Sequence, residues 1–308
     1  MSFTADVKAE LCARRGKGRH CEIAELAAIL NGCCKISREN GEPAIELHSD
    51  NPAVAKRFLD ITGGVFSAQA GVTESARRHR ILISGGPCEK ILSAAGLLAA
   101  EGGLETPQCR ISPMVVRQPC CKRAYIRGAF IACGSVAEPE KPYHLEFICE
   151  TRPLAEGLRD MIAFFEIHPK IITRSGRCVV YLKEGEGIAD LLNIMEAHAS
   201  LLQFESKRVY KSVRNKINRE SNCEVANMNK TVCASVRQIR DIRYIISKKG
   251  LDYLPEQLAE VAEIRLNNPG ATLLEISAML GHPVGKSGVN HRFRKISEIA
   301  DIIMAGAE

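Results

Sequence analysis

The sequence contains one helical pattern twice, with the copies one hundred residues apart. Residues 22–36 read EIAELAAILNGCCKI, and residues 122–136 read KRAYIRGAFIACGSV. In each copy small residues recur on one helical face. They are Ala24, Ala28 and Gly32 in the first copy and Gly128 and Ala132 in the second. Helices with such faces can approach until their backbones nearly touch. We therefore predict a closely packed helix pair at the centre of a duplicated domain.

The elements around these helices also repeat in order, so we predict an internal duplication at domain scale. After an opening helix (4–14), each copy predicts a helix, two strands, a helix opened by proline, two strands and a helix. The expected strands are 36–38, 44–48, 65–72 and 79–84, then 135–137, 143–149, 170–174 and 178–183. The expected helices are 23–34, 52–61 and 87–100, then 121–133, one opened by Pro153, and 187–197. The predicted class is α+β, a pseudo-symmetric αββαββα saddle whose concave sheet surface suits a DNA-sized cylinder.

Residues 26–34 and 126–134 resemble the two LAGLIDADG helices of homing endonucleases. The resemblance implies helices crossing at a pseudo-twofold axis, with an acid at the foot of each holding a divalent metal over DNA. The acidic motif positions here are Asn31, Cys33, Ile131 and Cys133. Mg²⁺ requires oxygen ligands, and neither helix places a carboxylate there. We therefore expect a LAGLIDADG-like scaffold with no catalytic residues, no nuclease metal and no cofactor.

The thirteen cysteines do not follow a known metal or disulfide spacing. No C-x-x-C pair occurs, and Cys33–Cys34 and Cys120–Cys121 are adjacent pairs, a poor arrangement for holding one tetrahedral ion. The start, MSFTADVKAELCARR, is amphipathic and charged rather than basic followed by apolar, so we expect no secretion signal. No apolar run approaches the length of a membrane span. We interpret the cysteines as small buried residues of a reducing cytoplasm.

Positive charge is concentrated late in the chain. Residues 205–250 hold 12 lysines and arginines against 4 acids, within an overall net charge of +6. The segment predicts helix with a break at Ser221-Asn222, where polar side chains compete for backbone hydrogen bonds, and a stop at Gly250. Two interpretations remain open: a solvated charged linker, or a stripe that follows DNA phosphates. The phosphate candidates are Lys207, Lys211, Arg214 and Arg219.

Residues 251–308 predict three short helices, the arrangement of a helix-turn-helix domain. Pro255 opens the first, and Thr272 with Glu275 forms a T-x-x-E capping box at the second. The third has one apolar stripe: Val289, Phe293, Ile296, Ala300 and Ile303. The stretch 281–287, GHPVGKS, is one residue short of a phosphate-binding loop and follows a helix, so we expect no nucleotide site and no small-molecule substrate.

The face opposite this stripe is a candidate for reading DNA. Residues 286–295 carry four positive charges and no acid, inside a segment whose net charge is otherwise negative. Arginine and asparagine read base edges, whereas lysine and arginine hold phosphates. The predicted base-reading residues are Ser287, Asn290, His291 and Arg294. The predicted phosphate-binding residues of this helix are Lys286, Arg292 and Lys295.

With both domains placed, nearly the whole chain resembles the WhiA-type bacterial regulators. The most specific segments are YIRGAFIACGSV (125–136), RNKINRESNCEVANMNKT (214–231) and PVGKSGVNHRFRKI (283–296). The resemblance implies a degenerate homing-endonuclease domain joined to a C-terminal helix-turn-helix. It also implies sequence-specific DNA binding, transcription control, and links to sporulation, cell division and chromosome segregation.

We therefore predict a non-enzymatic regulator with three parts: residues 1–204 form the LAGLIDADG-like domain, 205–250 a basic helical linker and 251–308 the helix-turn-helix domain. The expected partner is double-stranded DNA, with another transcription regulator or RNA polymerase as a further candidate. No membrane contact is expected, and the expected location is the cytoplasm, on the nucleoid. Two rivals are an active endonuclease, which the missing acids oppose, and a protein-interaction scaffold in division or replication that acts through the saddle. The mixed residues Glu46, His48, His144 and Glu146 on the expected sheet surface do not decide between DNA and protein there.

Overall fold

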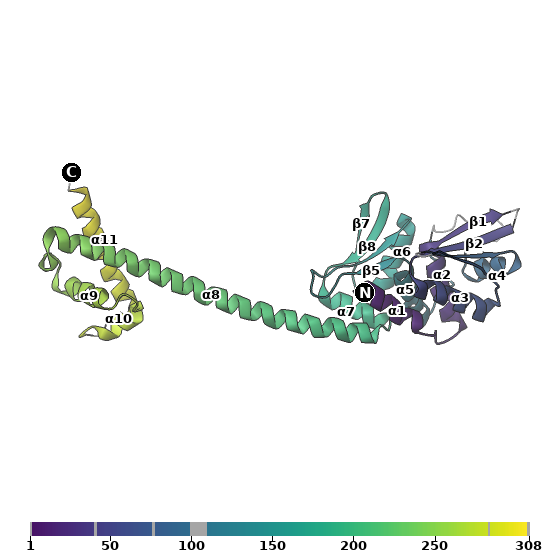
Figure 1. The fold of residues 1–308 in the computed structure, drawn as a ribbon, viewed down its shortest axis with the longest axis horizontal. Coiled ribbons are helices and arrows are strands. Elements are labelled where there is room, and N and C mark those ends of the chain that lie inside the picture. The colour runs from purple at the N-terminus through teal and green to yellow at the C-terminus, as the bar shows by residue number, and fades with distance from the viewer. Residues whose placement is uncertain (1, 40–41, 76–77, 99–109, 283, 307–308) are drawn as a thin grey trace. The chain divides into compact units, whose positions relative to one another are not determined.

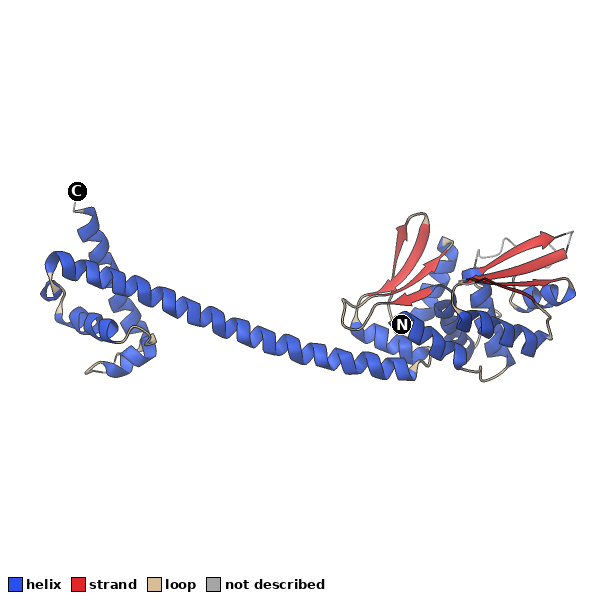
Figure 2. Ribbon diagram, viewed as in Figure 1, coloured by secondary structure: helices blue, strands red, loops and turns tan. Residues whose placement is uncertain are grey.

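The computed structural model describes residues 2–39, 42–75, 78–98, 110–282 and 284–306. The chain divides into two compact units, Met1–Ser212 and Val213–Glu308. Figures 1 and 2 show two sheets with covering helices in the first unit and helices in the second. Each unit is described by itself below.

The first unit contains the predicted duplication. After α1 (Phe3–Ala13), the first half consists of α2 (Arg19–Cys33), β1 (Cys34–Glu39), β2 (Glu42–Ser49), α3 (Pro52–Phe66), β3 (Gly71–Ser75), β4 (Arg78–Ser84) and α4 (Gly86–Ala94). The second half repeats this order with α5 (Pro119–Cys133), β5 (Gly134–Val136), β6 (Leu145–Cys149), α6 (Arg152–Ala163), β7 (Lys170–Arg174), β8 (Arg177–Leu182) and α7 (Gly185–Ile194). The αββαββα order of both halves is confirmed.

Each half folds its strands into one antiparallel sheet. The strand orders are β1-β2-β4-β3 and β5-β6-β8-β7, so the two sheets have equivalent topology. Apolar residues alternate along the strands: Leu145, Phe147 and Cys149 of β6 are buried, whereas Ile148 is exposed. One face of each sheet therefore packs on the helices, and a single core includes residues from both halves.

Two predicted boundaries in the first half were wrong. The strand expected at 65–72 begins only at Gly71, because α3 continues through Gly63-Gly64 to Phe66. Ser67, at a φ of 54°, ends that helix, and its N–H bonds to the carbonyl of Gly63. The helix expected at 87–100 ends at Ala94, and its last two expected residues lie outside the described part of the chain.

The break expected at Ser221-Asn222 was also wrong. The helix α8 runs without interruption from His198 to Lys249. Serine and asparagine cost a helix only about 0.5 kcal/mol each relative to alanine, and no glycine or proline occurs within α8. The first glycine to follow, Gly250, has a φ of 82° and comes directly after the helix, as predicted.

The second unit contains α8 from Val213 onward, the short η1 (Leu251–Tyr253), α9 (Glu256–Asn267), α10 (Leu273–Met279) and α11 (Lys286–Ala305). The capping box of Thr272 and Glu275 is confirmed. So is the apolar stripe of α11: Val289, Phe293, Ile296 and Ala300 are buried, and Ile303 is half-buried. Within the described residues, no helix combines the length and apolar character needed to cross a membrane.

Candidate nucleic-acid interface

The helices α2 and α5 pack as closely as their small residues predicted. A Cβ on Gly128 would lie 2.3 Å from the backbone oxygen of Glu25, and one on Gly32 would lie 2.6 Å from the Cβ of Ala132. Both distances are far below van der Waals contact, so only glycine fits at these two points without moving a helix. The helix pair of a LAGLIDADG-like domain is therefore present.

The motif positions that hold acids in homing endonucleases make other contacts here. The buried Asn31 donates from Nδ2 to the hydroxyl of Tyr125, at 2.9 Å. Cys33 and Cys133 donate to the carbonyls of Ile29 and Ala129 within their own helices, at 3.5 and 3.3 Å. Ile131 is fully buried. Asn31 thus joins the two helices, whereas the two thiols bond within their own helices, and none of the four side chains is a carboxylate.

One carboxylate does lie beside the foot of α2. A shallow pocket of about 330 Å³ there is lined by Gly32, Cys33, Cys34, Lys35, Ile36, His48 and Glu150. Glu150 forms an ion pair with Arg177, 3.1 Å from a guanidinium nitrogen. A single paired acid beside thiols is not the pair of carboxylates that a nuclease metal needs.

A buried ion network joins the two halves behind the helix pair. Glu25, fully buried, accepts from Arg57 of α3 at 2.6 Å and from Arg127 of α5 at 2.8 Å. Arg127 also lies 3.4 Å from Glu196, which pairs with Arg14 at 2.9 Å. Burial acts to lower the pKa of Arg57, but the Glu25 carboxylate outweighs it and the pKa is raised. The network is structural, because each of these charged side chains has a partner of opposite charge inside the protein.

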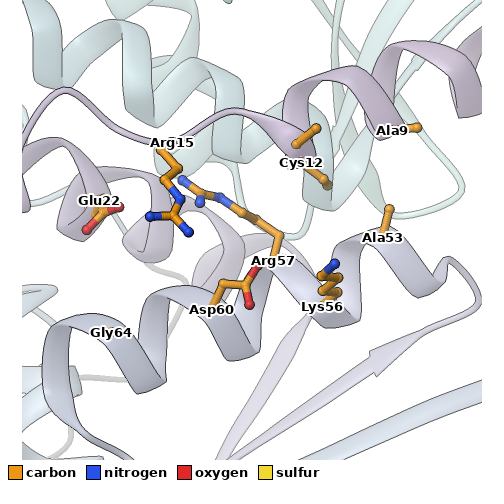
Figure 3. Close-up of a pocket in the computed structure, with 10 residues that line it drawn as sticks. Ala9, Cys12, Arg15, Glu22, Ala53, Lys56, Arg57, Asp60 and Gly64 are labelled. Atoms are coloured by element: carbon orange, nitrogen blue, oxygen red, sulfur yellow. The ribbon is translucent and has the colours of Figure 1, made fainter.

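A pocket of about 720 Å³ opens beside this network (Figure 3). Its lining comes from α1, α2, α3 and the segment after α1: Ala9, Cys12, Ala13, Arg15, Glu22, Ala53, Lys56, Arg57, Asp60 and Gly64. Burial, reinforced by the charge of Glu25, raises the pKa of the Cys12 thiol to about 12. A thiol held protonated in this way is a poor nucleophile.

The outer sheet faces carry mixed charge, as the sequence indicated. On the first sheet Glu46 pairs with Arg80 and with His48. On the second sheet the His144 ring nitrogen lies 3.0 Å from the Glu146 carboxylate. Both glutamates occupy the same place in the sheet, opposite Lys35 and Ser135 respectively. The described sheet residues therefore form neither a continuous basic surface nor an acidic one.

In the second unit, α11 exposes most of the predicted base-reading residues. Ser287, His291 and Arg294 are exposed, and Asn290 is half-buried beside the buried Phe293. Asn290 and Arg294 line a pocket of about 330 Å³, together with Arg237 and Gln238 of α8. The end of α8 therefore lies beside the candidate reading face, which the sequence did not predict.

The predicted phosphate-binding residues of α11 differ in their exposure and in their contacts with the rest of the protein. Lys286 and Lys295 are exposed. Arg292 is half-buried, with one nitrogen 2.8 Å from Nε2 of His282 and another 3.5 Å from the carbonyl oxygen of Gln257. These contacts hold its guanidinium next to the turn between α10 and α11.

The candidates on α8 fall into two pairs. Lys207 forms an ion pair with Glu140 at 2.7 Å. Lys211 donates to the carbonyl of Lys141 at 2.8 Å, with its ammonium 4.3 Å from the ring centroid of Tyr143. Arg214 and Arg219 are exposed, and Arg219 donates to a carbonyl of its own helix. The second pair is therefore freer to meet a polyanion.

One cluster of potential metal ligands was missed by reasoning along the sequence. His20 and Cys21 of α2 lie together with Cys120 and Cys121 of α5, all four ligand atoms within 4.8 Å of one another. Each adjacent cysteine pair alone is a poor arrangement for one ion, and the sequence does not show that residues of α2 and α5 come together. The available signal was the hundred-residue repeat, which makes positions 20 and 120, and 21 and 121, equivalent across the helix pair.

Comparison with known proteins agrees with this arrangement of domains. Residues 122–214 match the family described as the WhiA LAGLIDADG-like domain, and residues 217–300 match the WhiA C-terminal HTH domain. A relative from Alkaliphilus oremlandii, named probable cell division protein WhiA, is 44% identical and aligns over 99% of both chains. The chain belongs to the WhiA family.

Other WhiA proteins align over the same length. The probable cell division protein WhiA of Clostridium acetobutylicum is 41% identical over 98% of both chains. The crystal structure of full-length DUF199/WhiA from Thermatoga maritima covers 98% of both chains with a TM-score of 0.61 and 24% identity. The latter shows a shared fold. The LAGLIDADG-like domain followed by a helix-turn-helix domain is therefore established for this chain.

Proposed function

We propose that the protein is a sequence-specific DNA-binding regulator of transcription that acts without catalysis. The observation that carries this proposal is the exposed basic face of α11. Residues 286–295 include four positive residues and no acid, while the buried Phe293 anchors the helix in the domain core. The WhiA C-terminal HTH domain, which matches this part of the chain, supports the same function.

In this proposal some residues of α11 contact DNA bases and others contact the DNA backbone. Ser287, Asn290, His291 and Arg294 read base edges in the major groove. Arg294 can give two donors to guanine, and Asn290 can pair with adenine, each worth roughly 1–3 kcal/mol of discrimination. Lys286, Arg292 and Lys295 hold phosphates and fix the register. On α8, Lys207, Lys211, Arg214 and Arg219 are the further phosphate contacts.

We propose the same three parts of the chain, the LAGLIDADG-like domain (1–204), the basic linker (205–250) and the helix-turn-helix domain (251–308), with one change at the second boundary. Ile242 and Ile245 are fully buried against the helices that follow, so the end of α8 belongs to the core of the helix-turn-helix domain. The basic linker is then the preceding part of α8. The names of the relatives support a role in cell division. The proposal extends this role to sporulation and chromosome segregation, in the cytoplasm on the nucleoid, with RNA polymerase or a second regulator as partner.

The test is a binding-site selection on the full chain, comparing wild type with Arg294→Ala. The variant should lose preference at one or two base pairs and keep its non-specific affinity, because only a base contact is removed. Phe293→Ala should instead lose binding and stability together, since truncating a buried phenylalanine costs about 3–5 kcal/mol. Arg152→Ala, which removes an exposed arginine of the first unit, is the matched control. An Arg294→Ala profile equal to wild type at every position would refute readout by this helix.

The non-catalytic part of the proposal has its own test. Supercoiled plasmid incubated with pure protein and Mg²⁺ or Mn²⁺ should stay intact, because the motif positions present Asn31, Cys33, Ile131 and Cys133. Nicking that a chelator abolishes, and that tracks with the protein through purification, would contradict this and support the endonuclease alternative.

A second candidate function, a protein-interaction scaffold, is supported by one observation on the saddle. Ile148 and Ile172 are 38% and 45% exposed, and both register with Val179 on the outer face of the second sheet. Apolar side chains at the centre of a sheet face favour a protein partner over a phosphate backbone. Ile148→Lys with Ile172→Lys should leave DNA binding intact. Loss of function in the cell without loss of DNA binding would favour the scaffold.

A further inference from the structure

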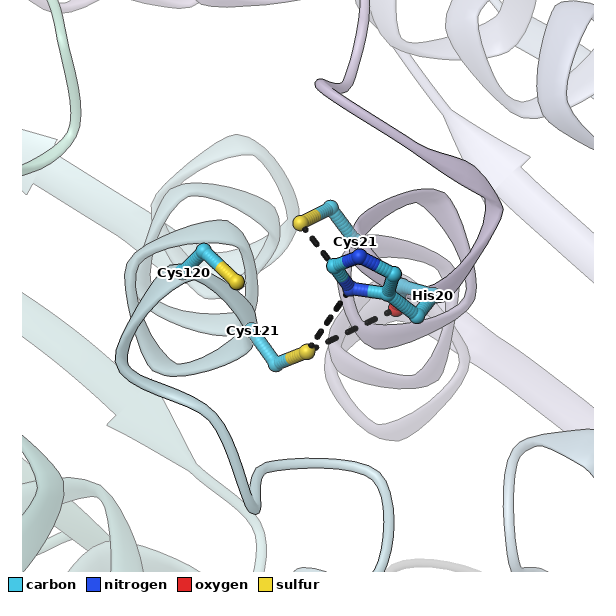
Figure 4. Close-up of side chains that lie close together, drawn as sticks. All are labelled: His20, Cys21, Cys120 and Cys121. Carbon is cyan, nitrogen blue, oxygen red and sulfur yellow. Dashed lines mark hydrogen bonds between the residues drawn. The ribbon is translucent and has the colours of Figure 1, made fainter.

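The first turns of α2 and α5 place four soft metal ligands at one point between the two halves (Figure 4). His20 and Cys21 are the second and third residues of α2, and Cys120 and Cys121 are the second and third of α5. The His20 Nδ1 lies 3.2 Å from the Cys121 sulfur and 3.3 Å from the Cys21 sulfur. All four ligand atoms lie within 4.8 Å of one another.

We propose that His20, Cys21, Cys120 and Cys121 form a tetrahedral zinc site that joins the two halves of the first unit. Zinc binds thiolate sulfur at about 2.3 Å and imidazole nitrogen at about 2.0–2.1 Å. A tetrahedron with these bonds holds its ligand atoms roughly 3.5–3.8 Å apart. The observed spacing is close to this, so small side-chain movements complete the site. The donor set of three sulfurs and one nitrogen is one that zinc prefers in structural sites.

The helix starts favour thiolates at this point. Neither α2 nor α5 has a side-chain hydrogen bond at its N-cap, so the first N–H groups of both helices lack that partner. The positive end of a helix dipole stabilises negative charge within its first turn. Two such ends meet here, and they offset part of the negative charge of three coordinated thiolates.

The chemistry of the donors gives the binding a pH dependence. Zinc binds cysteine as the thiolate and displaces its proton, so binding releases protons and strengthens as the pH rises.

The site is distinct from the place where a homing endonuclease holds its metal. That place is at the other end of the same helices, near Cys33 and Cys133. Twelve residues separate Cys121 from Cys133, which is about 18 Å of helix. With four protein ligands the zinc has no open position, so its role is to fix the two helix starts together and not to activate water.

The experiment uses the full chain, purified with a non-thiol reductant. Zinc content by mass spectrometry should be one per chain. Cobalt(II), used as a spectroscopic probe, should bind with the visible absorption of a tetrahedral ion and near-ultraviolet thiolate-to-metal bands. His20→Ala and Cys121→Ser should each weaken zinc binding by about 100-fold or more, because four ligands share the binding free energy. Removing the metal with a chelator should lower the melting temperature of wild type.

Two further variants keep the result unambiguous. His20→Cys retains four ligands and should keep one zinc per chain, with a cobalt spectrum shifted toward four sulfurs. Cys223→Ser removes an exposed thiol of α8 and is the matched control, with binding unchanged. Folded, fully reduced wild type that binds neither zinc nor cobalt would overturn the proposal. So would binding that survives the Cys21→Ser, Cys121→Ser double variant, or a disulfide between the two helices in place of the metal.

Discussion

The carboxylate of Glu25 on α2 forms an ion pair with Arg127 on α5, with 2.8 Å between Oε2 and Nη2. Neither side chain is more than 4% exposed. Arg57 holds the other carboxylate oxygen at 2.6 Å. One acid from the first half thus binds one arginine of its own half and one of the other. The Glu25–Arg127 pair therefore adds a specific charge interaction to the close packing of α2 against α5.

Glu25→Gln should be strongly destabilising. The change leaves the buried Arg57 without this carboxylate and leaves Arg127 with only its longer contact to Glu196, at 3.4 Å. Breaking a buried pair from one side costs about 3–5 kcal/mol. The free energy of unfolding from urea titration of the full chain measures this. Glu156→Gln, which removes an exposed pair with Arg152, is the matched control and should leave that free energy nearly unchanged. Equal effects of the two changes would contradict the role assigned to Glu25.

Acid should destabilise the protein partly through Glu196. Burial alone would raise the pKa of Glu196, but Lys17 and Arg14 outweigh it and hold the pKa below its ordinary value of 4.5. The stabilisation is therefore complete above about pH 4.5 and is lost as the pH falls through the lowered pKa. Unfolding free energies from about pH 6 to about pH 3 should fall less steeply in Glu196→Gln than in wild type. Parallel curves would show that Glu196 does not contribute.

Gly128→Ala should separate the helix pair. The added Cβ would meet the backbone oxygen of Glu25 at 2.3 Å, and backbone cannot yield as a side-chain end can. Overpacking of this kind costs roughly 1–3 kcal/mol or more. Gly64→Ala in α3 is a matched change, since nothing lies within 4 Å of its Cβ, and it should be neutral or slightly stabilising. The melting temperatures of both variants, compared with wild type, test this: an unchanged value for Gly128→Ala would contradict the prediction.

The salt dependence of DNA binding should distinguish the residues of α8. Arg214→Gln with Arg219→Gln should flatten the slope of log K against log salt by roughly two units, one for each phosphate contact. Lys207→Gln should change the slope less, because Glu140 already pairs with that ammonium. Affinity should fall equally on specific and non-specific DNA. An unchanged slope in the double variant would make this part of α8 a plain linker.

Much of the fold could be predicted because its signals are periodic. The apolar residues of α11 recur with the period of the helix, and the structure buries the four that this period places on one face: Val289, Phe293, Ile296 and Ala300. The small residues of α2 and α5 marked the close contact for a similar reason. Hydrophobic period and turn residues act within one element, so they can be read from one stretch of chain.

Features that depend on a partner element could not be predicted in this way. Nothing beside Asn31 in the sequence indicates that it donates to Tyr125. The continuity of α8 depended on the absence of glycine and proline, which outweighed the local preferences of Ser221 and Asn222. The assignment of bases and phosphates to α11 and α8 stays a prediction until DNA is bound.

The buried contacts between the halves also determine which half recognises which. The position equivalent to Glu25 in the second half is Tyr125, and the position equivalent to Arg127 in the first is Ala27. Two first halves brought together would leave Glu25 facing alanine, and two second halves would leave Arg127 facing tyrosine. In the first case Glu25 keeps only Arg57, and in the second Arg127 keeps only its longer contact with Glu196. Either pairing loses the buried ion pair between the halves, which the pairing of unlike halves retains. The duplicated sequence therefore favours one pairing, although the two halves share one architecture.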